Sequence, residues 1–274
     1  MEGNGMRYVY TRDDVKIFYR LIGTGPTTIL FVHPPGMGHI TFKQQLPLSK
    51  DFRLLYVDLR GNGNSDSGSV SIKFPLLARD LYDVCQQLDI DKVFICGYSN
   101  GASIAMETAI RYPNLVEGLL LIGAFSEVDS LLLGGEFLLG ITASKMKMMQ
   151  LLANVISNAH SYSKAFGKEM SDYFLRTDAD ILYQMYLEGL FYNCTKKLPS
   201  ISCPILLIYG QKDYYVHHYQ YKFMKRHRDT KVIYVSGARH QIPTKHSTIL
   251  NAITKQFIQN QKMDTKTKGS HSTP

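Results

Sequence analysis

Short uninterrupted runs of apolar residues alternate with segments of helical spacing along most of the chain. Residues 28–33 form such a run, whereas Leu77, Leu81, Val84 and Leu88 fall on one side of a helix. Strands that are apolar on both faces are typical of a parallel sheet covered by helices on each side. The pattern predicts strands at 8–10, 15–21, 28–33, 52–58, 92–96, 116–122, 204–210 and 231–235, and helices at 72–88, 99–111, 218–228 and 247–260.

The rhythm of the sequence changes after Ala124. From residue 131 to residue 193 the spacing is helical throughout, with no strand-like run until residue 204. We therefore predict an α/β core made of residues 1–124 and 200–262. A helical cap of residues 125–199 interrupts this core, and residues 263–274 form a disordered tail.

The composition is that of a folded globular protein. Apolar residues make up 45% and charged residues 20% of 274 positions, which excludes intrinsic disorder, collagen and a small cystine-rich scaffold. The four cysteines form no CxxC pair and no metal-ligand spacing. We therefore expect reduced thiols, no metal and no cofactor.

The net charge of +8 comes largely from two basic segments, residues 222–231 and 255–268. No nucleic-acid-binding motif accompanies them, so we interpret them as solvated surface. The longest apolar stretch, residues 131–141, contains Glu136 and is too short to span a bilayer. With no signal-peptide pattern at the start, we expect a cytoplasmic protein that acts on a small molecule, without a nucleic-acid partner and without stable membrane insertion.

The strongest chemical signal is the pentapeptide 97–101, Gly-Tyr-Ser-Asn-Gly, which matches G-x-S-x-G between a predicted strand and a predicted helix. In that context the turn holds Ser99 in a strained conformation above the sheet. Side chains at Gly97 and Gly101 would clash there. The helix that follows favours developing negative charge at its N-terminus. Ser99 is therefore the predicted nucleophile.

A serine nucleophile needs a base, and the base needs an acid that fixes its tautomer. His240 follows the predicted strand 231–235, and Asp213 follows the strand 204–210. The order Ser99, Asp213, His240 is the order expected for a strand-turn-helix nucleophile of this kind. Glu127 and Asp129, which follow the strand 116–122, are the alternative acids.

Together these motifs resemble the α/β-hydrolase superfamily, in its capped, esterase-like branch, from about residue 8 to residue 260. The resemblance rests on four segments: 31–36, 58–65, 97–101 and 237–240. It implies a mostly parallel eight-stranded sheet with helices on both faces and an inserted helical cap. It also implies a serine nucleophile without a cofactor, and a mainly structural turn at 58–65.

One departure from the family pattern concerns the oxyanion hole. Family members usually carry His-Gly-x after the early strand, and the x residue donates a backbone N–H to the oxyanion. This chain has His33-Pro34-Pro35 instead, and proline has no N–H. A missing oxyanion donor costs about 2.7–4 kcal/mol of transition-state stabilisation.

The other candidate donors to the oxyanion are identified by their place in the sequence. The N–H of Asn100, next to the nucleophile, is one expected donor. We expect the second to come from the N–H of Gly36 or Met37 in a reshaped loop, with the Tyr98 side chain as another possibility.

These features predict a serine hydrolase that cleaves a small or medium, largely apolar ester or lactone through an acyl-enzyme. Two alternatives stay open: a ligand-sensing protein with slow or single-turnover chemistry, and a C–C hydrolase or lyase with the same three residues. Some apolar cap residues either line an acyl pocket or pack the cap. They are Phe137, Leu138, Met146, Met148, Met149 and Phe166.

Overall fold

The computed structural model describes residues 7–269 of the chain. Within them, eight strands form one sheet in the order β1-β2-β4-β3-β5-β6-β7-β8. Antiparallel pairing joins β1 to β2 and β2 to β4, and all other pairs are parallel. The sheet is therefore mostly parallel, as the resemblance implies. The strands are β1 (Arg7–Tyr10), β2 (Lys16–Ile22), β3 (Thr28–Val32), β4 (Arg53–Val57), β5 (Val93–Tyr98), β6 (Val116–Ile122), β7 (Ile205–Gly210) and β8 (Thr230–Val235).

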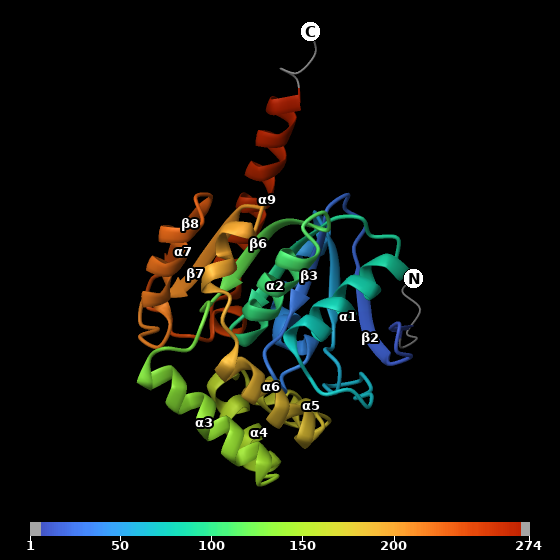
Figure 1. Ribbon diagram of the computed structural model, residues 1–274, viewed down its shortest axis with the longest axis vertical. Helices are drawn as coiled ribbons and strands as arrows, with labels where there is room; N and C mark the ends of the chain where they lie inside the picture. The colour runs from blue at the N-terminus through green and yellow to red at the C-terminus, as the bar shows by residue number, and fades with distance from the viewer. Residues whose placement is uncertain (1–6, 270–274) are drawn as a thin grey trace.

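Helices cover both faces of this sheet (Figure 1). Neighbouring residues of β3 point to opposite faces: Leu30 packs in one apolar cluster with Leu77 of α1 (Phe74–Gln87), and Ile29 packs in another with Phe257 of α9 (Ser247–Gly269). The first face also carries α2 (Asn100–Arg111) and α7 (Gln220–Arg226). The second carries the 3₁₀ segment η1 (His39–Lys50) and α8 (Ile242–Lys245). Burial on both faces explains why these strands are apolar without alternation.

Four helices between β6 and β7, called here the cap helices, group at one end of the sheet (Figure 1). They are α3 (Leu131–Lys145), α4 (Met149–His160), α5 (Lys164–Phe174) and α6 (Ala179–Phe191). Side chains of Ser130, Ser163 and Asp178 accept hydrogen bonds from backbone N–H groups at the starts of α3, α5 and α6, and so cap these helices. Two short 3₁₀ segments complete the chain, η2 (Thr195–Ser200) and η3 (His217–Tyr219).

The strands and helices predicted from the sequence are present, with ends that differ by a few residues. The short segments η2 and α8 were not predicted, and neither was the longer η1, which contains Pro47 and has no clear apolar periodicity. At the other end, α9 continues to Gly269, so residues 263–269 of the predicted tail are helical. Residues 270–274 lie outside the described chain. None of the described helices combines the length and the apolar character that crossing a membrane requires.

Candidate active site

The segment between β5 and α2 forms a sharp turn at Ser99, whose backbone adopts φ 53° and ψ −125°. A positive φ is strained for a residue with a side chain. The two flanking glycines permit the turn because other backbone lies against them. A Cβ on Gly97 would lie 2.7 Å from the Ala102 Cα, and one on Gly101 would lie 2.3 Å from the Val32 carbonyl oxygen. The steric reason that we infer from the sequence for these glycines is therefore present in the structure.

Three side chains from three loops form one hydrogen-bonded chain. The Ser99 Oγ lies 2.9 Å from the His240 Nε2, and the His240 Nδ1 lies 2.6 Å from the Asp213 Oδ2. The Asp213 side chain is 1% exposed and that of His240 is 24% exposed, so the carboxylate is sequestered while the imidazole stays within reach of a ligand. The structure thus brings together the nucleophile, base and acid that the sequence predicts.

The loops after β7 and β8 hold this geometry because they are bonded to each other. The N–H of Gln211 donates to the Val235 carbonyl oxygen at 3.0 Å, and the N–H of Lys212 donates to that of Ala238 at 2.8 Å. Both loops leave the carboxyl edge of the sheet, where side chains of neighbouring parallel strands meet. Asp213 and His240 are therefore fixed relative to each other by backbone as well as by their own contact.

The electrostatic surroundings favour the charged form of His240. Burial lowers the pKa of the imidazole, but the charge of Asp213 and its hydrogen bond, together with the charge of Glu136 on α3, outweigh burial and raise the pKa overall. A base whose conjugate acid is stabilised in this way is suited to accept a proton from a serine hydroxyl.

The two alternative acids take part in a different cluster. Glu127 accepts hydrogen bonds from Lys222 at 2.5 Å and from the Thr195 hydroxyl at 2.9 Å, and Asp129 also pairs with Lys222. These contacts join the segment after β6 to α7 and η2. Asp213 is the carboxylate that contacts His240.

The loop after β3 offers few free amide donors. The N–H of Gly36 donates to the Asn62 Oδ1 at 2.7 Å, and the N–H of Met37 donates to the Pro34 carbonyl oxygen at 3.3 Å. Pro35 has no N–H. Both amides that the sequence analysis names for the second oxyanion donor are therefore engaged within the protein in this conformation.

The residues on either side of the nucleophile differ in their contacts. The N–H of Asn100 belongs to the first turn of α2, where amides have no intrahelical acceptor. The Asn100 side chain is buried beneath α6: its Nδ2 lies 3.4 Å from the Met185 carbonyl oxygen, and its Oδ1 has no partner among the described residues. Gly189 permits this approach, because a Cβ there would lie 2.5 Å from the Nδ2.

Tyr98, the other neighbour of Ser99, is 1% exposed. Its ring lies against those of His240 and of His160, the last residue of α4. Within the described chain its hydroxyl has no hydrogen-bond partner. No sequence motif marks His160.

The apolar cap residues divide into two groups. Phe137 and Phe166 are buried, and Met149 is partly buried against a small cluster between cap helices. Leu138, Met146 and Met148 are exposed.

An apolar groove of about 490 Å³ runs along α3. Leu132, Leu138, Leu139 and Glu136 border it on the helix, and Tyr215, from the loop that carries Asp213, borders it on the core. Glu136, one of its lining residues, is also the residue whose charge contributes to the raised pKa of His240.

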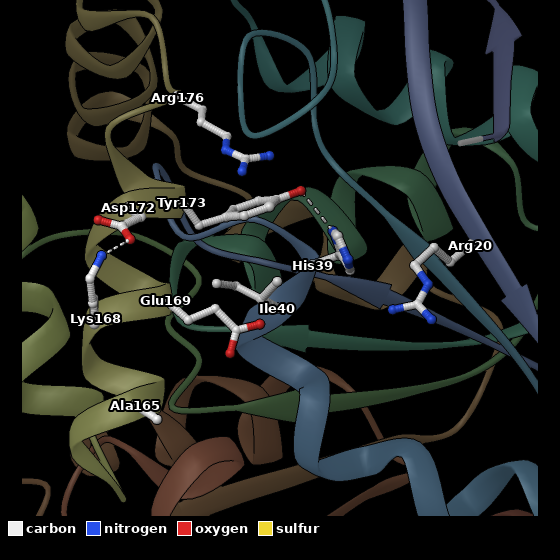
Figure 2. Close-up of a pocket in the computed structure, with 9 residues that line it drawn as sticks. All are labelled: Arg20, His39, Ile40, Ala165, Lys168, Glu169, Asp172, Tyr173 and Arg176. Carbon is white, nitrogen blue, oxygen red and sulfur yellow. Dashed lines mark hydrogen bonds and ion pairs between the residues drawn. The ribbon is translucent and has the colours of Figure 1, made fainter. Parts of the chain in front are cut away.

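A second cavity, of about 560 Å³, lies where α5 meets β2 and η1 (Figure 2). Its lining includes the charged residues Arg20, Lys168 and Arg176. Tyr173 lies at its centre and donates a hydrogen bond to the Asp58 Oδ2 at 2.5 Å, which joins the cap to the core. The turn that begins at Asp58 thus has the structural role that the resemblance implies.

Among the described residues, no cluster of three or more His, Cys, Asp or Glu side chains is arranged to hold a metal ion. The four cysteines are all free and buried.

Comparison with known proteins gives a family. The model of the serine aminopeptidase S33 family matches residues 48–245. Human serine hydrolase BPHL is 25% identical over 262 residues, which cover 89% of this chain and 84% of the human protein. The AB hydrolase superfamily protein YisY of Bacillus subtilis is 26% identical over 221 residues, covering 75% of this chain and 81% of YisY.

Solved structures share the fold at low sequence identity. An esterase from Exiguobacterium antarcticum has a TM-score of 0.84 at 17% identity, covering 93% of this chain and 100% of the esterase. The enol-lactonase from Burkholderia xenovorans LB400 has a TM-score of 0.82 at 18% identity, covering 92% and 100%. The family match and these folds agree with the architecture described above. The chain belongs to the serine aminopeptidase S33 family of the α/β-hydrolase superfamily and is an α/β-fold serine hydrolase.

Proposed function

We propose that the protein hydrolyses a small or medium, largely apolar carboxylic ester or lactone through an acyl-enzyme formed on Ser99. The hydrogen-bonded chain from the Ser99 Oγ through His240 to Asp213 carries this proposal. The apolar groove along α3 supports the choice of an apolar small-molecule substrate.

The mechanism follows from the contacts. The Ser99 Oγ attacks the carbonyl carbon while the His240 Nε2, 2.9 Å away, accepts its proton. Asp213 stabilises the imidazolium through the bond to Nδ1. His240 then gives the proton to the leaving alkoxide. In the second half, His240 accepts a proton from water, whose oxygen attacks the acyl carbon. The bond from the acyl carbon to the Ser99 Oγ then breaks, the acid leaves, and His240 returns the proton to the Ser99 Oγ.

The oxyanion hole is the weakest part of this machinery. The Asn100 N–H is the first donor, placed by the start of α2. Gly36 becomes a donor only when its N–H leaves the Asn62 Oδ1, where it lies at 2.7 Å. A substrate whose oxyanion competes for that N–H completes the hole, and this step predicts slower acylation than a preformed hole gives.

The test is hydrolysis of a panel of short and medium esters, lactones and aminoacyl amides by the wild type and by Ser99→Ala. Aminoacyl amides are included in the panel because the matching family is described as serine aminopeptidases. We expect turnover of esters or lactones that Ser99→Ala abolishes while its thermal unfolding is unchanged. Full ester turnover by the folded Ser99→Ala protein would refute the mechanism.

A second candidate function is supported by the engaged amides of Gly36 and Met37. With one free amide donor, the protein acts as a ligand sensor that reacts with its ligand once or slowly. Steady-state measurement separates the two candidates: many turnovers per protein molecule favour the hydrolase, and a single stoichiometric release of alcohol favours the sensor.

A further inference from the structure

Three aromatic rings in contact form a row that joins the cap to the base of the candidate site. The ring centroid of Tyr98 lies 5.2 Å from that of His240, with an interplanar angle of 38°. On its other side the Tyr98 centroid lies 5.8 Å from that of His160, at 71°. Tyr98 therefore lies between a core histidine that contacts the nucleophile and a histidine of the cap.

The Tyr98 hydroxyl is a buried donor without an acceptor. The residue is 1% exposed, and no described residue bonds to its hydroxyl. Burial, followed by the charges of Asp213 and Glu136, raises the pKa of this phenol well above its ordinary value, so the group keeps its proton. A buried polar group without a partner destabilises the folded protein and in native structures often marks a functional position.

His160 supplies a complementary acceptor. The residue is 4% exposed, and its Nδ1 lies 3.3 Å from the Thr244 Oγ1. We assign the hydrogen of His160 to Nδ1, as donor to Thr244, because the Thr244 hydroxyl lies 3.4 Å from the Gln241 carbonyl oxygen and can donate its own proton there. The Nε2 then bears the lone pair, and no described residue donates to it. Burial, with the nearby charges of His240 and Lys245, lowers the pKa of His160 to about 3, which keeps the ring neutral.

We propose that the Tyr98 hydroxyl and the His160 Nε2 form a polar subsite that binds a hydroxyl group on the acyl part of the substrate. A hydroxyl accepts a hydrogen bond from Tyr98 and donates one to His160, so it satisfies both groups. A carbonyl oxygen satisfies only Tyr98, and an ammonium group satisfies only His160. The Tyr98 ring contacts that of His240, so the proposed subsite adjoins the base, on the acyl side of the substrate.

This inference refines the proposed function, because it names hydroxyacyl esters as the preferred substrates. Neither residue is a catalytic residue: the two select among substrates. A site built to hydrogen-bond a hydroxyl discriminates strongly against analogues that lack it, because its polar groups are then buried unpaired.

The experiment measures binding without chemistry, using the full chain with Ser99→Ala. Ligand-observed NMR titration gives the Kd values of methyl hexanoate, methyl 2-hydroxyhexanoate and methyl 3-hydroxyhexanoate. We expect at least one hydroxy ester to bind about tenfold more tightly than methyl hexanoate, the gain of one to two net hydrogen bonds. Adding Tyr98→Phe or His160→Phe should reduce this preference to about twofold or less.

Tyr56→Phe is the matched control. Tyr56 is also buried and also has a hydroxyl without a partner among the described residues, but it lies in β4, stacked on Phe31. The Tyr56→Phe substitution should leave the preference for the hydroxy ester unchanged. Because Tyr98→Phe removes an unpartnered polar group, it should unfold at the same or a higher temperature than its parent, so a loss of preference is not a loss of folding.

Equal binding of the three esters, or a preference that survives both substitutions, would overturn the subsite. Hydrolysis of the same esters by the wild type tests the proposed function separately. A hydroxyl preference that depends on Tyr98 and His160, with no turnover by the wild type, would support the subsite and contradict the hydrolase. Hydrolysis of these esters by the wild type without a hydroxyl preference would support the hydrolase and contradict the subsite.

Discussion

Gly123 at the end of β6 supports the position of the proposed base, and replacing it tests how finely that position matters. Its backbone has φ +57°, and a Cβ built there would lie 2.6 Å from the His240 Cε1 and 2.8 Å from the Nδ1. The imidazole lies directly against this glycine. Gly123→Ala therefore introduces one methyl group into the space that the ring occupies.

The size of the effect follows from these distances. Non-bonded carbon atoms prefer separations of about 3.5–4.0 Å, so the ring must move by about 1 Å. A displacement of that size costs about a hundredfold in rate when it separates a base from its nucleophile. The left-handed backbone adds about 1–2 kcal/mol of destabilisation for alanine. We expect Gly123→Ala to lose about a hundredfold in kcat/KM on an ester substrate and to remain folded.

The assay combines ester hydrolysis with thermal unfolding, and Gly237→Ala is the control. Gly237 has a similar φ, +68°, but a Cβ there would meet nothing within 4 Å. The Gly237→Ala variant should show the destabilisation that a left-handed backbone causes for alanine. Its activity should stay within about threefold of the wild type, since no contact displaces His240. Wild-type activity in Gly123→Ala would refute the argument that His240 acts from its observed position.

Two further substitutions test the electrostatics of the site and of the core. The charge of Glu136 raises the pKa of His240, and the base works in its neutral form. Glu136→Gln should therefore shift the acidic limb of the pH profile of kcat/KM to lower pH. An unshifted limb would contradict an effect of Glu136 on the pKa of His240. Arg60 is fully buried and pairs with Asp80 at 2.7 Å, so Arg60→Met should lower the free energy of unfolding, measured by urea denaturation, by about 3–5 kcal/mol. The control Lys43→Met removes the exposed pair with Glu169 and should change this free energy by less than about 1 kcal/mol. Equal losses in the two variants would contradict the role of burial.

The sequence predicts much of the fold because local patterns determine it. The apolar runs of the parallel strands and the G-x-S-x-G turn each depend on neighbouring residues. The order Ser99, Asp213, His240 then places the three residues in loops at one edge of the sheet. The 3₁₀ segment η1 was missed because Pro47 and the mixed burial of its residues give no helical period.

Other features of the site depend on contacts between distant segments, which no local pattern reveals. The N–H of Gly36 is engaged because Asn62, 26 residues later, accepts its hydrogen bond. His160 approaches Tyr98 only because the cap packs over the sheet. For the same reason, sequence spacing did not distinguish the buried Phe166 from the exposed Met148 within the cap.

The central claim is that His240 and Asp213 activate Ser99, and covalent labelling tests it most directly. Intact mass is measured after exposure to a fluorophosphonate, on the wild type and on Ser99→Ala, with folding of both checked by thermal unfolding. The hydrogen-bonded chain predicts one adduct per wild-type molecule and none on Ser99→Ala. A folded wild type that forms no adduct, or an equal adduct on Ser99→Ala, would contradict an activated serine at this position.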